Sequence, residues 1–425
     1  MNYFTDPIVR APMLGSLFMG LAASLIGVLT FLRKRSLLAE SLSHASYPGA
    51  VLAISVFALF FPLTEPPSGI ILVGAFLSAL LGLFAINWIH KKGMIKNDAA
   101  LCLILSGFFG VGLTFASLLQ WTHPVWYKKI QLFLFGQTAT LTDIHSFFYA
   151  GLALTILLFL WVFSRSIQAV YLDRQYAKSL NLRVSLMENW TTLFLVFSVV
   201  AGIRCVGVVL MSGMLIAPPL AARQWTDKLS VMFILSAAFG MTSAFLGNVI
   251  SYEWATIFGE NLSFPTGPSI VLCASFFAFF SLLFAPKRGM IFRMARIFRF
   301  RLKCQEENLL KWAWKKKGSF SQKDCNHHHS RYLLFLLRGK GAVKRVGTGF
   351  ALTSKGEKKA TQVVRLHRLW EVYLIEHLGL GADKVHPNAE EMEHILTPEM
   401  EEKLTRLLQN PTMDPHNNPI PQRGA

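Results

Sequence analysis

Histidine and glutamate side chains recur at helical spacing near the C-terminal end of the chain. The candidate ligands are His367, Glu371, His386, Glu390, Glu393 and His394. The first two and the last three are each spaced to share one face of a helix, and His386 lies just before the second helix. Imidazoles with carboxylates suit Mn²⁺ or Fe²⁺ and suit Cu(I) less. Two such faces packed together predict a divalent-metal site; ordinary solvated i, i+4 pairs are the competing interpretation.

A second pair of ionisable residues lies at the edge of an apolar run. Glu40 and His44 are spaced i, i+4 and share a face if this segment is helical. Ionisable groups beside a membrane-spanning segment are costly and often functional. The pair therefore predicts contact with a passing cation, whereas hydration or capping at a loop–helix junction would leave it without that role.

A strongly basic segment precedes the histidine-rich end. We expect helices near 307–317, 319–326 and 329–337, then a glycine-rich stretch at 338–352 with short β-prone runs, the pattern of a winged helix-turn-helix. Its cations would contact DNA phosphates, which dominate affinity. The candidate contacts are Lys323, Arg331, Arg338, Lys340, Lys344 and Arg345. The competing interpretation places this charge against the inner membrane surface.

These residues belong to a chain whose charge is unevenly distributed. The 425 residues include 53% hydrophobic ones, with a mean hydropathy of +0.42 and a formal net charge of +18. Residues 1–286 carry a net charge of +6, residues 287–360 of +16 and residues 361–425 of −4. The five cysteines are scattered and do not suggest a disulfide framework. We therefore expect a membrane part followed by a basic part and an acidic part.

Apolar runs of spanning length fill the first 286 residues. They fall near 11–32, 46–63, 69–89, 99–120, 145–164, 190–222, 229–250 and 265–285. Each approaches or exceeds the roughly 20 residues that a helix needs to cross the hydrocarbon, and open strands would leave backbone groups unpaired there. Basic loops place the N-terminus outside and the C-terminal part in the cytoplasm, which requires an odd number of crossings. The run 190–222 could be a helical pair or a re-entrant segment, so we expect eight or nine transmembrane helices.

The predicted fold is an all-α polytopic membrane domain followed by a small winged helix-turn-helix and a helical metal-binding domain. The expected parts are a membrane domain 1–286, a basic juxtamembrane linker 287–305, a winged helix-turn-helix 306–360 and a metal-sensing and dimerisation domain 361–425. In the linker, cations alternate with bulky apolar residues, which is typical of an anchor on anionic headgroups. A linker exposed to proteolysis is compatible with this.

Several segments of the membrane part resemble the manganese, zinc and iron permease family of ABC transporters. They are 27–49, 132–136, 173–182, 207–210, 215–218 and 264–268. The resemblance implies a permease of the bacterial inner membrane that imports Mn²⁺, Fe²⁺ or Zn²⁺ as a homo- or heterodimer. It also implies an extracytoplasmic metal-binding protein and a separate ATP-binding cassette subunit. That ATPase would dock on the segment containing Asp173, Arg174, Ala177 and Leu180, with Asn181 where the family usually has glycine.

The chain has no G-x-x-x-x-G-K-[ST] phosphate-binding loop. We therefore expect this chain to bind no nucleotide and to be a transport subunit without enzymatic activity, with ATP hydrolysed by its partner.

The C-terminal part resembles the diphtheria-toxin-repressor family of metal-dependent repressors. The similar segments are 352–356, 365–371, 385–394 and 414–421. The resemblance places Glu390, Glu393 and His394 at one metal position and His367, Glu371 and His386 at the other. The family usually has a further ligand in its first helix, where Asn308 falls in this chain. It also implies dimerisation through 361–408.

The leading hypothesis is one polypeptide with two linked activities. The permease would import the metal, and the tail would bind Mn²⁺ or Fe²⁺ and repress transcription of its own transport genes. The alternative is a tail that senses metal and regulates transport directly, without DNA.

Overall fold

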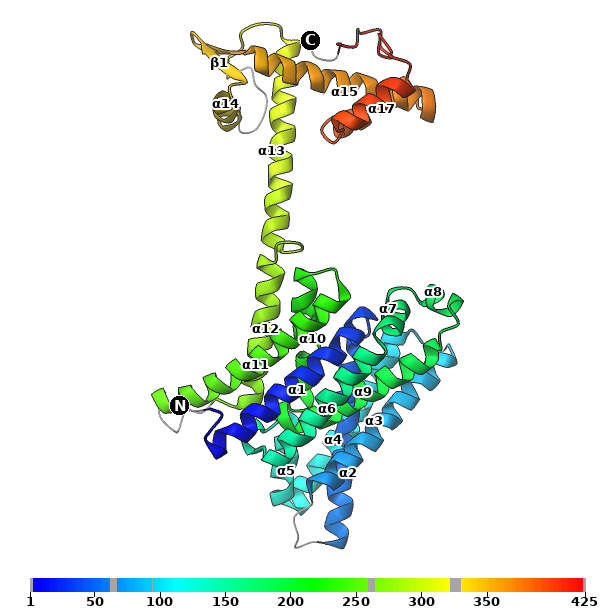
Figure 1. Ribbon diagram of the computed structural model, residues 1–425, viewed down its shortest axis with the longest axis vertical. Coiled ribbons are helices and arrows are strands. Elements are labelled where there is room, and N and C mark those ends of the chain that lie inside the picture. Colours follow the sequence, from blue (N-terminus) through cyan, green and yellow to red (C-terminus); the bar gives the residue numbers. More distant parts are fainter. Residues whose placement is uncertain (1–2, 62–66, 94, 259–263, 322–329, 423–425) are drawn as a thin grey trace. The chain divides into compact units, whose positions relative to one another are not determined.

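The structure, a computed structural model, describes residues 3–61, 67–93, 95–258, 264–321 and 330–422 (Figure 1). The chain forms two compact units, residues 1–292 and residues 293–425. The four-part division expected from the sequence remains a prediction at its finer boundaries.

The described part of the first unit is helical throughout. Its elements are α1 (Pro7–Leu32), α2 (Ser36–Phe60), α3 (Ser68–Lys91), α4 (Asn97–Thr122), α5 (Pro124–Phe135), the 3₁₀ helix η1 (Thr138–Thr140), α6 (Asp143–Val162), α7 (Ser164–Leu172), α8 (Arg174–Ser179), α9 (Val184–Val206), α10 (Val208–Trp225), α11 (Leu229–Phe258) and α12 (Thr266–Phe284). Within the described residues, eight helices are long and apolar enough to span a membrane: α1, α2, α3, α4, α6, α9, α11 and α12. The expectation of a polytopic helical membrane domain is confirmed.

The long run 190–222 is a pair of helices. α9 ends and α10 begins on either side of Gly207, whose φ of 98° lies in the left-handed region. A Cβ at Gly207 would collide with the backbone of Leu134 and Phe135, so glycine supplies both the turn and the close approach of α5. α10 contains Pro218 and Pro219, and Met211, Met214 and Leu215 are fully buried. A broken helix of this kind is tolerated in a membrane where protein surrounds it.

Small residues let α1 pack closely on its neighbours. Gly20 faces the backbone of Gly240 on α11, and Gly27 faces the Leu215 carbonyl on α10. Such small residues allow helix backbones to approach in lipid, where no hydrophobic force drives helices together. The Ser236 hydroxyl donates to the Ser24 carbonyl over 3.0 Å and adds a polar link between α11 and α1.

The second unit combines helices with a short hairpin. Its elements are α14 (Ser330–Gly339), β1 (Val343–Val346), β2 (Gly349–Leu352), α15 (Ser354–Leu378), α16 (Ala382–Met392) and α17 (Pro398–Leu407), together with most of α13 (Met290–Lys315). β1 and β2 are antiparallel, with Val343 opposite Leu352 and Gly347 in the left-handed region at the turn. The hairpin is the expected wing, and the winged fold class is confirmed. Of the helix expected at 319–326, residues 322–326 lie outside the described residues, and its start is not helical, because Phe320 forms an antiparallel bridge with Phe350 of β2.

α13 begins earlier than the sequence reasoning expected. A helix was expected from 307, yet the basic residues from 290 onward belong to the same helix. The segment 290–315 contains neither proline nor glycine and is rich in arginine, leucine and lysine, which are good helix formers.

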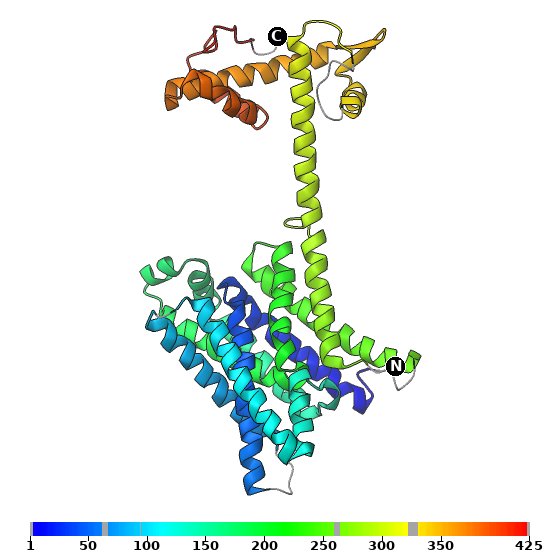
Figure 2. The same cartoon turned by 180° about the vertical axis from the view of Figure 1, so that it is seen from behind.

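The C-terminal segment is fastened to α15, beside which α17 lies in both views (Figures 1 and 2). Leu369 and Val372 of α15 pack with Leu404, Leu408 and Ile420. Arg365 donates to the Glu401 carboxylate over 2.9 Å, to the Thr405 hydroxyl over 3.2 Å and to the Pro421 carbonyl over 2.7 Å. These bonds fasten α17 and Pro421 to α15, and Arg368 of α15 holds the segment between them through Asp414, 3.4 Å away, and the Pro419 carbonyl.

Candidate metal centre

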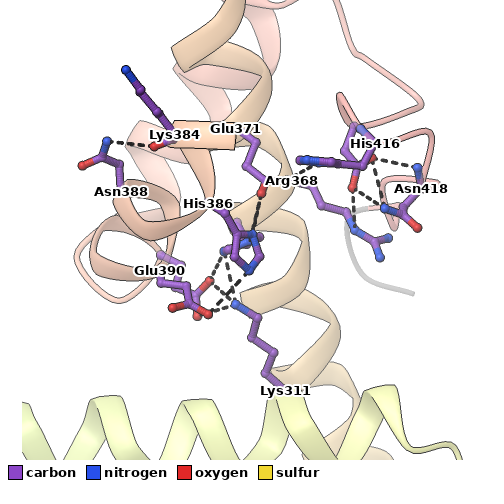
Figure 3. Close-up of polar contacts among 12 residues, drawn as sticks. Lys311, Arg368, Glu371, Lys384, His386, Asn388, Glu390, His416 and Asn418 are labelled. Carbon is purple, nitrogen blue, oxygen red and sulfur yellow. Dashed lines mark hydrogen bonds and ion pairs between the residues drawn. The ribbon is translucent and has the colours of Figure 1, made fainter. Parts of the chain in front are cut away.

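Three of the six candidate ligands form a compact cluster between α15 and α16. The ligand atoms of His367, Glu371 and His386 all lie within 4.8 Å of one another. Glu371 Oε1 is 3.2 Å from His367 Nε2 and 2.8 Å from His386 Nδ1, and the two histidines approach to 3.0 Å. His386 lies inside α16, although the sequence reasoning placed it before the helix. Pro387 follows it there, and the Asn388 side chain donates to the Lys384 carbonyl over 3.3 Å (Figure 3).

The other three candidate ligands, in the last turn of α16 and just after it, point in different directions. Glu393 is completely buried, and its Oε2 is 2.5 Å from His367 Nδ1, so it faces the first cluster. His394 turns towards α13, where its Nδ1 is 2.8 Å from Glu307 Oε2 and its Nε2 is 3.1 Å from Asn308 Oδ1. Glu390 is largely exposed and lies 3.7 Å from His386 Nε2. Glu393 and Glu390 therefore both approach histidines that the resemblance assigned to the other metal position.

Lys311 of α13 occupies the middle of this arrangement. Its ammonium is 2.7 and 3.0 Å from the two oxygens of Glu393 and 3.1 Å from His367 Nδ1 (Figure 3). The side chain is only 8% exposed. The sequence did not point to this residue. A lysine three positions after Asn308 gives no sign of a role in metal binding, because its contacts with His367 and Glu393 arise only when the chain folds.

A second set of possible metal ligands also includes Glu371. Its carboxylate lies within 4.8 Å of ligand atoms of Asp414 and His416. Asp414 is buried and accepts bonds from the backbone N–H groups of His416 at 2.9 Å and Asn418 at 2.7 Å. Sequence reasoning used this segment only for the resemblance and did not name these two residues as ligands. The sequence Asp414-Pro-His416, with two possible ligands two positions apart, was the signal that could have identified them.

Hydrogen bonds outweigh burial in setting the pKa values of the cluster. Burial alone would raise the pKa of Glu371, but bonds from His367 and His386 lower that pKa to about 2. Burial would also raise the pKa of Glu393, and bonds from His367 and Lys311 lower it. Burial would lower the pKa of His367, yet its bonds to Glu371 and Glu393 raise it. The carboxylates are therefore ionised, as ligation of a metal cation requires.

The donor set fits a divalent transition metal. Imidazole and carboxylate groups without a thiolate suit Mn²⁺, Fe²⁺ or Zn²⁺. A cavity of about 420 Å³ adjoins the cluster and is lined by His367, Glu371, His386, Asp414 and His416 among others. An ion could reach the cluster through it.

The candidate DNA-binding residues lie on the helix-turn-helix side of the second unit. Arg331 and Arg338 are exposed on α14, and Lys344 and Arg345 are exposed on β1. Lys340 instead bonds both oxygens of the buried Glu306, at 2.6 and 2.7 Å, which reduces its availability to a phosphate. Lys323 lies outside the described residues.

In the membrane unit, Glu40 and His44 both lie on α2. His44 is buried and packs edge-on against Phe109, with ring centroids 4.6 Å apart. Its Nδ1 has no hydrogen-bond partner among the described residues. A buried nitrogen without a hydrogen-bond partner is available to bind a ligand.

The expected coupling segment forms a short capped helix. Asp173 caps α8 by accepting from the N–H groups of Gln175 and Tyr176 at 2.9 and 3.0 Å. Ala177 is fully buried and Leu180 is exposed. Asn181 has a φ of 56°, which explains how asparagine replaces glycine at this turn. Arg174 lies 3.3 Å from Glu188 of α9.

Comparison with known families identifies both parts of the chain. Residues 5–285 match the ABC 3 transport family, and residues 353–422 match the metal binding and dimerisation domain of iron dependent repressors. The chain belongs to the ABC 3 transport family. It is a multi-pass membrane permease subunit with a C-terminal metal-dependent repressor domain, so the two resemblances and the predicted fusion are confirmed.

Individual relatives match this chain to different extents. A "Probable metal transport system membrane protein" of Chlamydia trachomatis is 36% identical over 99% of this chain and 97% of that protein. The "Manganese transport system membrane protein MntC" of Bacillus subtilis is 31% identical over 86% of this chain and 84% of that protein. The solved structure of PsaBC from Streptococcus pneumoniae in complex with Fab is 26% identical, covers 68% of this chain and 95% of that one, and has a TM-score of 0.57.

Proposed function

We propose that this permease imports Mn²⁺, Fe²⁺ or Zn²⁺ across the bacterial inner membrane and that its cytoplasmic tail binds Mn²⁺ or Fe²⁺ to repress its own transport genes. Import would require a separate ATP-binding cassette subunit, a second permease subunit and an extracytoplasmic metal-binding protein. The manganese relative named above supports the choice of cargo class.

The observation that carries the sensor proposal is the convergence of ionised carboxylates and imidazoles on one centre, at which His367 and Glu371 are buried and His386 is exposed. His367, Glu371 and His386 would hold one ion on the Nε2 side of His367, whereas Glu393 lies on the Nδ1 side of the same ring. Glu393 and His394 would form a second position beside Glu307 and Asn308, to which the resemblance also assigns Glu390. A bound cation would neutralise these carboxylates.

Metal binding would also make the second unit more rigid. The ligands come from α15, α16 and the turn after it, and α13 supplies Glu307 and Asn308. An ion held by these elements stabilises the arrangement in which all of them meet. Because α13 and α14 share one hydrophobic core through Leu309, Leu310, Leu333 and Leu337, that order would extend to the DNA-binding helix.

In the membrane unit, we assign Glu40 and His44 to the path of the cargo metal. The buried and unpaired Nδ1 of His44 supports this assignment. The α8 segment with Asp173, Arg174, Ala177 and Leu180 would dock on the ATPase, and the exposed Leu180 supports a contact there.

The test uses the full chain in lipid nanodiscs with DNA from upstream of its own gene. Mn²⁺ should raise DNA affinity, and the affinity should fall steeply with salt. Arg345→Gln should weaken binding and reduce the salt slope by about one. Fluorescence anisotropy measures both. DNA binding that ignores Mn²⁺, or Mn²⁺ binding without DNA binding, would refute the repressor proposal.

A further inference from the structure

Lys311 places a cation where the proposed metal would have to bind. Its ammonium contacts both oxygens of Glu393 and lies 3.1 Å from Nδ1 of His367. Glu393 is a ligand of the second metal position proposed above, with His394, and the Nδ1 atom of His367 lies beside it. Glu393 is completely buried, so little solvent screens this pair.

An ammonium and a metal ion cannot share these atoms. Ligand atoms lie roughly 2.0–2.2 Å from a transition-metal ion, whereas the ammonium holds the same oxygens at 2.7 and 3.0 Å. A dication placed beside Glu393 would also stand within a few ångströms of the ammonium charge and would be repelled by it.

We propose that Lys311 is a built-in competitor for the divalent metal, whose ammonium neutralises Glu393 in the metal-free tail and must leave when the ion binds. This inference rests on the proposed metal-sensing function and assigns that site a residue that sets its affinity. Metal would have to exceed a threshold concentration before the sensor responds.

The proposal predicts opposite effects on two properties of one variant. In Lys311→Met, Glu393 loses its cation, so the metal-free tail should be less stable. Its affinity for Mn²⁺ should nevertheless rise roughly tenfold to a hundredfold, because the ion no longer displaces a positive charge. A lysine with only a packing role would lower stability and metal affinity together.

Lys315 offers a matched control. It lies one turn further along α13 and lines the same cavity, yet it is exposed. Lys315→Met removes the same charge without removing the contact with Glu393, so Mn²⁺ affinity should stay near that of the wild type. Lys311→Arg keeps the charge and should not gain affinity.

The experiment measures Mn²⁺ binding to the detergent-solubilised full chain by equilibrium dialysis. Binding retained by a Glu371→Ala/His394→Ala double variant is subtracted, because it belongs to other parts of the chain. Hydrogen exchange of α15 peptides without metal reports the stability of the tail. Tighter binding by Lys311→Met than by wild type and Lys315→Met supports the proposal.

Two outcomes overturn it. If wild type binds Mn²⁺ above the background and Lys311→Met binds no more tightly, the lysine is not a competitor, while the metal site stands. If neither binds above the background, the metal site itself is refuted, and the competitor with it.

Discussion

One buried carboxylate joins the two sets of ligands in the metal centre. The Glu393 side chain has no exposed surface and is held by Lys311 from α13 and His367 from α15. Removing one partner of a buried ion pair leaves the other charge uncompensated, which costs more than the pair contributes. Glu393 therefore links the stability of the metal-free tail to the proposed binding of metal.

Glu393→Gln should destabilise the metal-free tail by roughly 3–5 kcal/mol, because the Lys311 ammonium stays buried without a counter-charge. Adding Lys311→Met should recover much of that loss, since the two residues interact directly. Hydrogen exchange of α15 peptides in the full chain measures both effects. In the control variant Glu390→Gln, which changes an exposed side chain, the α15 peptides should exchange at the wild-type rate. Equal exchange in the single and double variants would contradict this pairing.

At the scale of elements, the helices could be predicted from sequence better than their contacts. Length and hydropathy located the eight spanning helices, and i, i+4 spacing placed His367 with Glu371. The remaining features depend on packing. Asp414 and His416 reach Glu371 because Arg368 of α15 pairs with Asp414 and bonds the Pro419 carbonyl. Lys311 reaches Glu393 only because α13 crosses near the end of α16.

The break between α9 and α10 gives a prediction at this scale. Gly207→Ala forces a side chain into a left-handed conformation and against the backbone of Leu134 and Phe135. The strain alone should cost about 1–3 kcal/mol, and the collision adds to it. Gly151→Ala on α6 is the control, because its added methyl group meets no atom within 4 Å. Thermal unfolding of the detergent-solubilised protein should show a lower midpoint for Gly207→Ala alone.

At the scale of the whole molecule, the residues that we propose for transport and for metal sensing lie in different compact units. Glu40 and His44 belong to the first, whereas His367 and Glu371 belong to the second. Substitutions separated in this way have effects that usually add independently. If the tail acts through DNA, damage to one centre should therefore leave the other activity intact.

Two double variants test that separation. Glu40→Gln/His44→Ala should lower uptake of radioactive Mn²⁺ roughly tenfold or more, as loss of metal ligands does elsewhere, and should retain Mn²⁺-dependent DNA binding. His367→Ala/Glu371→Ala should lose metal-dependent DNA binding while uptake per molecule stays at the wild-type rate. Uptake is measured in cells expressing equal amounts of each protein with its ATPase from a constitutive promoter, so that repression cannot change the result. If the tail variant alters uptake under these conditions, the tail acts on transport directly and the DNA-dependent mechanism is wrong.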